Sequence, residues 1–395
     1  MAKLGEVFEC QITGEWGKEC SENESGIKVL RTTNFTSDGV INYTSVVERN
    51  ISESKVEKKK LQFEDIILEK SGGTEKTPVG RVVYCDKTIE NDVYLCNNFT
   101  QAMRVNKQIA FPRYIFYYMW FCHYSGKTEL LQNKTTGIRN LQVKAYMNEE
   151  IELPNLEQQK KIVDKLDKIA DCVNNRKSQL EKLDELVKSR FIEMFGRVCD
   201  NKYSYEVKSL QDVCEKIKDG THQTPKYTDD TVSGYKFLSS KDVTTGRINW
   251  EHIKYIPEEL HNELYAKIAP RRGDILLAKN GTTGIAAIVD TDEVFDIYVS
   301  LALLRPVDLN SVYLWAAINS YETKQQFDAS LKGVGVPNLH LGEIKKTRIL
   351  VPPLDLQNQF ADFVAQVDKS KLVAQRGAVG RFFHKRDSLH RIYLQ

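Results

Sequence analysis

The sequence predicts an α+β fold: two globular units related by a pseudo-two-fold internal repeat and separated by long helices that form an antiparallel coiled coil. Three observations predict this fold. The same short segments occur twice in the same order, each copy combines short β-rich runs with a helical stretch, and a long segment without proline or glycine lies between the copies. A chain of 395 residues is long enough for roughly two or three domains, each with its own core.

The repeat is clearest where each copy ends. Asn338 follows Asn140 by 198 residues, and the pattern Ile-x-x-Pro-x-Leu-x-x-Gln begins at Ile151 and again, 198 residues later, at Ile349. Three earlier segments match in the same order with small shifts in offset, and they are residues 26–30 with 234–238, 38–42 with 245–249, and 65–70 with 274–279. Four ordered matches indicate a duplicated domain rather than chance similarity.

Each copy has the composition of a mixed α and β unit. Short β-rich runs at 29–30, 66–68 and 285–289 are separated by Gly and Asn turns. Helical stretches follow at 114–124 and 312–331, and each copy closes with a strand that ends at a proline. The uncharged run 114–122 is far too short to span a bilayer, so it predicts a buried helix.

A long helix is predicted between the copies, because residues 157–195 contain neither proline nor glycine and Gly196 supplies a stop. Apolar residues recur along it at alternating three- and four-residue steps, namely Ile162, Leu166, Ile169, Val173, Leu180, Leu183, Val187 and Met194. Arg176 and Arg190 interrupt this seam. A narrow seam of this length favours antiparallel pairing with the equivalent helix of the second copy over packing on one domain.

The second copy departs from the pattern after about Val373. Gly377 and Gly380 fall inside the expected helix, and residues 376–395 carry five Lys or Arg against one Asp. We therefore expect a shortened helix followed by an atypical basic tail. Two explanations stay open: a rearrangement that replaced the ancestral C-terminus, or a diverged tail that adds phosphate contacts.

The composition excludes several classes of function. The start of the chain has no apolar run typical of a signal peptide, and the eight cysteines form no Cys-x-x-Cys pair, so we expect a soluble, cytoplasmic protein without zinc or disulfides. Gly126-Lys127-Thr128 lacks the glycine that a phosphate-binding loop requires five residues earlier. The seven histidines show no metal-ligand spacing. We expect neither a catalytic site nor a bound cofactor or metal in this chain.

The two half-repeats, each closing with the Ile-x-x-Pro-x-Leu-x-x-Gln junction and joined by a long seam helix, resemble the specificity (S) subunits of type I restriction–modification enzymes. The resemblance covers residues 1 to about 373. It implies a target-recognition domain at 1–153, a central spacer helix at 154–197, a second target-recognition domain at 198–351, a shortened spacer helix at 352–375 and the tail at 376–395.

The resemblance also implies a function and partners. Each target-recognition domain of this family reads one half of a split sequence in double-stranded DNA, and the helices dock two methyltransferase (M) subunits, which restriction (R) subunits then join. S-adenosylmethionine, ATP and magnesium are accordingly expected on these partner subunits and not on this chain. The net charge is only +2, so a DNA-binding surface must come from local clustering of basic residues.

Polar loop positions that match between the copies are the candidates for DNA contact. Arg and Lys recognise guanine or phosphate, Asn recognises adenine, and Ser and Thr are more permissive. The candidates in the first half are Arg31, Thr32, Thr33, Asn34, Lys70, Lys134, Arg139 and Asn140. Those in the second half are Lys218, His222, Ser239, Ser240, Lys241, Lys279, Asn280, Lys332 and Asn338.

Three alternatives stay open at this point. The first is the specificity subunit of a type IIB-like system, which the neighbouring genes would identify. The second is a coiled-coil adaptor protein that does not bind DNA; it explains the helix and the repeat but not the matched polar loops. The third is a stand-alone nuclease, which would require metal-dependent cleavage by the purified chain.

Overall fold

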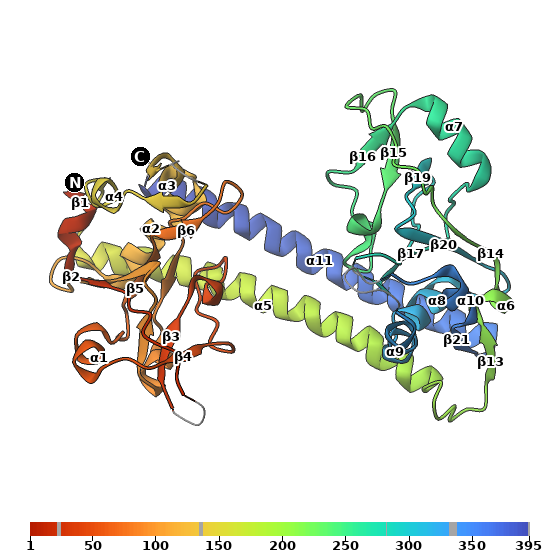
Figure 1. The fold of residues 1–395 in the computed structure, drawn as a ribbon, viewed down its shortest axis with the longest axis horizontal. Helices are drawn as coiled ribbons and strands as arrows, with labels where there is room; N and C mark the ends of the chain where they lie inside the picture. Colours follow the sequence, from red (N-terminus) through yellow and green to blue (C-terminus); the bar gives the residue numbers. More distant parts are fainter. Residues whose placement is uncertain (22–24, 134–136, 282, 332–337, 394–395) are drawn as a thin grey trace. The chain divides into compact units, whose positions relative to one another are not determined.

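The structure is a computed structural model. It describes residues 1–21, 25–133, 137–281, 283–331 and 338–393, with backbone alone beyond residue 374. The chain forms two compact units, one from residues 1–176 with 377–395 and the other from residues 177–376 (Figure 1). In the described part of the chain, no helix combines the length and the apolar character needed to cross a membrane.

The first unit is built on a four-stranded antiparallel sheet and a three-stranded sheet. The larger sheet has the order β2-β9-β5-β7, from Phe8–Thr13, Thr100–Val105, Ile66–Glu69 and Val82–Tyr84. The smaller has the order β4-β3-β8, from Val47–Arg49, Ile27–Leu30 and Tyr94–Cys96. Short pairings join β1 (Ala2–Lys3) to β12 (Glu150–Ile151), and β10 (Gln132–Asn133) to β11 (Arg139–Leu141) and β6 (Ser71–Gly73). The helices are η1 (Leu4–Val7), η2 (Thr32–Asn34), α1 (Glu53–Lys59), η3 (Lys87–Asn91), α2 (Pro112–Tyr124), α3 (Lys127–Leu130) and α4 (Val143–Met147).

The second unit repeats this design. Its four-stranded sheet has the order β14-β20-β17-β18, from Cys214–Asp219, Leu301–Pro306, Ile275–Ala278 and Ala286–Ile288. Its three-stranded sheet has the order β16-β15-β19, from Lys254–Ile256, Tyr235–Leu238 and Phe295–Ile297, and β13 (Glu206–Ser209) pairs with β21 (Arg348–Val351). The helices are α6 (Leu210–Val213), η4 (Ser240–Val243), α7 (Glu258–Lys267), α8 (Ser311–Ile318), α9 (Tyr321–Ser330) and α10 (Leu341–Lys346).

The two units share strand order and strand direction, which confirms the repeat and the α+β class. In each small sheet the last-named pair is parallel, β3 with β8 and β15 with β19, while both large sheets are antiparallel. The central strands β5 and β17 are buried along their whole length, because each separates two cores, and apart from Glu69 at the end of β5 all their residues are apolar. Alternate residues of β5 enter different hydrophobic clusters, with Ile66 and Leu68 in one and Ile67 in the other. In β17, Leu276 and Leu277 divide in the same way.

The predicted helical stretches are confirmed with one difference. All residues from 114 to 122 are buried in α2, as the short apolar run predicts. The stretch 312–331, expected to be one helical region, contains two helices. Ser320 caps the start of α9 by accepting a hydrogen bond from the Thr323 backbone N–H, and the Asn319 carboxamide bonds to the backbone of Ala286. Side chains that compete for backbone groups end a helix in this way.

The repeated Gln of the terminal motif joins the long helix to the unit before it. Gln159, in the first turn of α5 (Leu156–Phe195), donates to the Pro154 carbonyl at 2.7 Å and accepts from the Phe111 N–H at 2.7 Å. Gln357, in the first turn of α11 (Leu354–Tyr393), donates to the Pro352 carbonyl at 2.8 Å and accepts from the Asn310 N–H at 2.9 Å. Phe111 and Asn310 are the N-cap residues of α2 and α8. The motif therefore positions two helix starts against one strand end.

The long helix α5 confirms the predicted seam, since each of its eight seam residues is buried or partly buried. Within the second unit, the C-terminal part of α5 packs antiparallel to the first part of α11. Phe191 contacts Phe360 edge to face at 5.5 Å, and the Asp184 carboxylate, two turns earlier in α5, pairs with Lys371, three turns later in α11. The interrupting Arg190 lies over the Phe363 ring.

The predicted shortening of the second spacer helix is wrong. We expected the helix to end near residue 375 and the tail at 376–395 to be atypical, yet α11 continues to Tyr393 and has the same length as α5. A glycine inside a helix costs only about 1 kcal/mol relative to alanine, whereas proline is the residue that stops a helix. Residues 354–395 contain no proline, so Gly377 and Gly380 lower the stability of this helix without ending it.

In the second unit, α7 is anchored by a buried contact between a histidine and an aspartate. The His261 Nδ1 lies 2.7 Å from Asp296 Oδ2 on β19, and the His261 ring stacks on Tyr235 with a centroid distance of 3.7 Å. Burial raises the pKa of the Asp296 carboxyl from 3.8 to about 6, although the hydrogen bond from His261 opposes this shift.

We expect this raised pKa to be measurable as a pH-dependent stability. The folded chain holds the Asp296 proton more tightly than the unfolded chain, so the stabilisation from this group is complete below pH 4 and is lost as the pH rises through 6. A shift of two pKa units corresponds to about 3 kcal/mol. The free energy of unfolding of the wild type relative to Asp296→Asn should therefore fall between pH 4 and pH 7 in urea titrations. A difference that is constant with pH would contradict this assignment.

The glutamine junction predicts a specific loss of stability. Gln159→Ala leaves the Phe111 N–H and the Pro154 carbonyl without their partner, and each unsatisfied group costs about 1–3 kcal/mol when it is buried. We expect the free energy of unfolding to fall by at least about 2 kcal/mol, with faster hydrogen exchange at the start of α2. The control is Gln158→Ala, an exposed neighbour in the same turn, which should change stability by less than about 0.5 kcal/mol.

Candidate nucleic-acid interface

Three of the predicted residues in the first unit meet at one sheet edge. Lys70 follows β5 directly, its backbone carbonyl accepts from the Leu141 N–H at 2.9 Å, and β6 then pairs with β11. Asn140 lies opposite Ser71, and Arg139 lies opposite Gly73. All three predicted side chains are partly exposed. Backbone pairing thus joins Lys70 and β6 to β11, which lies more than 60 positions further along the chain, in one polar edge.

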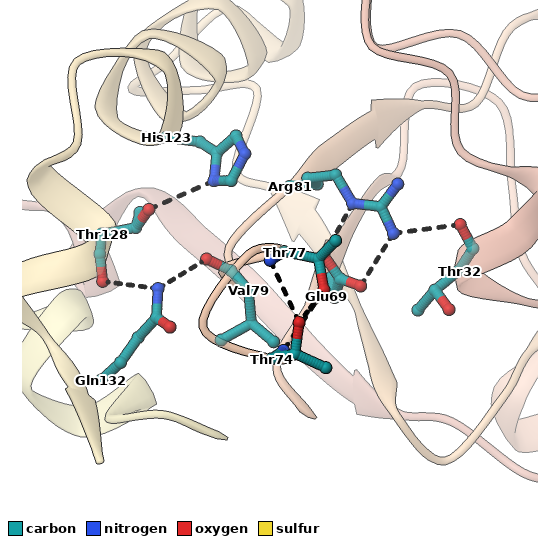
Figure 2. Close-up of polar contacts among 9 residues, drawn as sticks. All are labelled: Thr32, Glu69, Thr74, Thr77, Val79, Arg81, His123, Thr128 and Gln132. Carbon is teal, nitrogen blue, oxygen red and sulfur yellow. Dashed lines mark hydrogen bonds and ion pairs between the residues drawn. The ribbon is translucent and has the colours of Figure 1, made fainter. Parts of the chain in front are cut away.

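A bidentate ion pair joins the predicted loop 31–34 to this edge. The Arg81 Nε and Nη2 donate to the Glu69 carboxylate at 2.8 and 2.9 Å, and the same Nη2 donates to the Thr32 carbonyl at 3.2 Å (Figure 2). Glu69 is buried and immediately precedes Lys70. The hydrogen bonds to Glu69 raise the pKa of the Arg81 guanidinium. This pair could not be predicted from the sequence, because no local pattern links residues 69 and 81.

The loop beyond β6 is held by hydroxyl and amide groups, which Figure 2 also shows. The Thr74 and Thr77 hydroxyls lie 2.7 Å apart, and Thr77 N–H donates to Thr74 Oγ1 at 3.2 Å. The Gln132 carboxamide donates to the carbonyls of Val79 and Thr128 at 3.0 and 3.2 Å. His123 Nδ1 lies 3.2 Å from the Thr128 hydroxyl, and burial lowers the pKa of this imidazole, which keeps it neutral at pH 7.

The other first-unit candidates differ in how free their side chains are. Asn34 is buried: its carboxamide accepts from the Arg31 N–H at 2.9 Å and donates to the Asn42 carbonyl at 2.9 Å, so it holds its own loop. Arg31 donates to the Ser45 carbonyl at 3.1 Å, while Thr33 is exposed. Lys134 lies outside the described residues.

The second unit forms the equivalent edge. The Lys279 carbonyl accepts from the Leu339 N–H at 2.8 Å, as Lys70 does from Leu141, and Asn280 forms a β-bridge with Asn338. On η4, Ser239 bonds to Asp242, the Ser240 N–H donates to Ser300 Oγ at 3.0 Å, and Lys241 is exposed. Because the Lys279 N–H donates to the Ser300 carbonyl at 2.9 Å, Ser300 links η4 to the same edge. Lys332 lies outside the described residues.

The charge of Lys279 is compensated inside the second unit. Its ammonium group lies 2.7 Å from the Asp219 carboxylate, which His222 Nε2 also approaches at 3.1 Å. The Lys279 side chain is only 7% exposed, and that of Asp219 is 19% exposed. Lys279 therefore positions Asp219 and His222, while Lys218 and His222 are the exposed groups here. Asp219 could not be predicted as part of this edge from the sequence, because its contact with Lys279 joins residues 60 positions apart.

The described residues include no group of three or more His, Cys, Asp or Glu side chains that could hold a metal ion. The polar edges of the two units instead offer Lys and Arg donors, Asn carboxamides and hydroxyl groups. These are the groups that bind phosphates and the edges of bases.

A duplicated α+β scaffold with a polar edge at the same place in each copy defines a class of recognition proteins built from two like domains. The chain belongs to the family described as Type I restriction modification DNA specificity domain, whose model matches residues 1–185 and 203–378.

Individual relatives agree with this family. The chain is 27% identical over 256 residues to the type I restriction enzyme MjaVIII specificity subunit of Methanocaldococcus jannaschii, a match covering 60% of this chain and 59% of the relative. It is 22% identical over 330 residues to the EcoBI specificity subunit of Escherichia coli, covering 77% and 66%. Each match thus spans less than two thirds of the relative's length.

Two solved structures share the fold. One is the type I restriction–modification S subunit from M. genitalium, with a TM-score of 0.54 at 13% identity, covering 99% of this chain and 95% of the other. The second comes from a study of complex assembly and conformational transition in the type I R-M system, with a TM-score of 0.53 at 18% identity, covering 99% and 96%.

The buried lysine predicts an asymmetric response to mutation. Asp219→Asn leaves the Lys279 ammonium group buried without a counter-charge, which we expect to cost about 2–4 kcal/mol of unfolding free energy, near the lower end for breaking a buried pair. Adding Lys279→Met should restore most of this loss. Urea titration and hydrogen exchange in β14 and β17 measure both effects.

The control is Asp292→Asn, which removes the partner of Arg272 in an exposed pair and should change the stability far less, because solvent screens the charges of an exposed pair. If Asp219→Asn were no more destabilising than this control, the ion pair would not be what holds Lys279 in place.

Proposed function

We propose that this chain is the DNA sequence-specificity subunit of a type I restriction–modification enzyme. In this role each unit reads one half of a bipartite target, and the chain docks methyltransferase and restriction subunits. The observation that carries the proposal is the equivalence of the two polar edges, in a chain that belongs to the specificity-domain family. A duplicated reader matches a two-part site in double-stranded DNA, as a two-fold dimer matches two half-sites.

The proposed role of each edge follows from its donors and acceptors. In the first unit, Arg139 and Asn140 have the fork and carboxamide chemistry that reads guanine and adenine, and Lys70 suits a phosphate. In the second unit, Asn280 and Asn338 are the candidates for bases, and Lys218, His222 and Lys241 for the backbone. Of the remaining candidates, Arg31, Thr32, Thr33, Asn34, Ser239 and Ser240 belong to the loops that support each edge.

We propose that the chain itself is not catalytic. Its partners would be two M subunits and the R subunits, and S-adenosylmethionine, ATP and magnesium would be bound by them. The names of its relatives, which are specificity subunits of type I restriction enzymes, support an assembly of this kind.

Single-molecule methylation sequencing of the source genome, with and without this gene, tests the proposal. We expect a split motif that loses its methyladenine when the gene is deleted and regains it on complementation. Complementation with Arg139→Ala/Asn140→Ala should alter or abolish recognition of one half of the motif only, because these residues belong to one unit. The exposed Lys58→Ala on α1 should leave the motif unchanged. If deletion changes no methylated motif, the proposed function is wrong.

A further inference from the structure

The turn between β8 and β9 presents an aromatic ring beside the first polar edge. Phe99 lies in this turn with 45% of its surface exposed. Its backbone carbonyl accepts from the N–H groups of Lys70 and Ser71 at 2.9 and 3.2 Å. Below it, the buried Thr100 hydroxyl donates to the Asn97 carbonyl at 2.8 Å. The turn is thus fixed at both ends while the side chain projects.

The ring lies against the strand that carries the polar pairings. Gly72 has a φ of +93°, and a Cβ placed there would lie 3.6 Å from Phe99 Cδ2. Gly72 separates Ser71 and Gly73, which pair with Asn140 and Arg139. A large apolar group is therefore adjacent to the proposed base-reading residues. Single exposed apolar residues are common on protein surfaces, so it is this location that sets Phe99 apart.

The same turn in the second unit shows that the scaffold does not need an aromatic residue. Ser300 occupies the equivalent place, because its carbonyl accepts from the Lys279 N–H at 2.9 Å. The Leu301 N–H bonds to the Tyr298 carbonyl at 2.9 Å, as Thr100 bonds to Asn97 at 3.0 Å. Ser300 is only 7% exposed, and its hydroxyl bonds to the Ser240 N–H. The same turn therefore carries an exposed apolar side chain in the first unit and a buried polar side chain in the second.

We propose that Phe99 is a specificity-determining residue that contacts the C5-methyl group of a thymine in the half-site read by the first unit. Only thymine presents an apolar group in the major groove of unmodified DNA, and aromatic side chains are among those that contact it. Hydrogen bonds to phosphates and sugars require polar groups, whereas an apolar ring beside base-reading residues matches the methyl group of thymine. This inference rests on the proposed function and adds a base identity to it.

Uracil substitution isolates the methyl group. The chain, assembled with its methyltransferase subunits, is bound to duplexes carrying the split motif in which each thymine, on either strand, is replaced in turn by uracil. The wild type should lose about fourfold in affinity at one thymine of the first unit's half-site, as expected for about one buried methyl-sized group at about 0.8 kcal/mol. Phe99→Ser, which copies the second unit's residue, should bind more weakly and show no loss at that uracil.

Controls and outcomes separate this inference from the proposed function. Val93→Ala, which changes another exposed apolar residue of the first unit, should keep the wild-type uracil response, as should every thymine of the other half-site. Equal uracil sensitivity of the wild type and Phe99→Ser at every position overturns the role of Phe99 while leaving the proposed function intact. A wild-type assembly that binds no split motif overturns both.

Discussion

A buried glutamine must satisfy both ends of its carboxamide, and in each copy of this fold one glutamine does so between the same three elements. Gln159 and Gln357 each donate a hydrogen bond to a proline carbonyl at a strand end. Each also accepts one from the N–H of the residue that begins a helix of the globular unit. Because an unmade bond at a buried site costs more than a made one contributes, these contacts fix where each long helix starts and in which direction it leaves. The long helix of each copy is thereby joined to the unit that carries the polar edge of that copy.

The junction is reinforced by a tyrosine that no local pattern reveals. The Tyr114 hydroxyl donates to the Glu152 carbonyl at 3.0 Å, and the Tyr313 hydroxyl donates to the Leu350 carbonyl at 2.6 Å. The two carbonyls lie at equivalent places, two residues before the prolines. A strand end held from a helix on one side and from a glutamine on the other has little freedom. This explains why the spacing of the terminal motif is identical in the two copies while the loops vary in length.

Much of the fold could be predicted from the sequence, because repetition and periodicity are local signals. The apolar seam of α5, the buried run in α2 and the matched strands β5 and β17 were all found in this way. The end of α11 was predicted too early, because Gly377 and Gly380 lower the stability of a helix without ending it. The ion pairs could not be predicted from the sequence either. Arg104 with Asp65 and Arg305 with Asp274 form equivalent bidentate pairs in the two copies, but each arginine lies on one strand (β9 or β20) and its aspartate directly before another (β5 or β17). Only the folded register brings such residues together, as for Glu69 with Arg81 and Asp219 with Lys279.

The two edges share a backbone but differ in charge, and a single pair of equivalent positions explains much of the difference. Thr13 ends β2 opposite Gln101, and Asp219 ends β14 opposite Ala302. Both are followed by a glycine, Gly14 or Gly220, at which a Cβ would meet a backbone oxygen at 1.8 or 2.0 Å. The close approach of the chains therefore belongs to the scaffold in both copies, whereas the residue before the glycine does not. In the second unit that residue is an acid that neutralises Lys279, while Thr13 brings no charge to the edge that carries Lys70. Duplication has kept the backbone contacts that place an edge and has released the side chains on it, which is the condition under which two like domains can come to recognise unlike surfaces.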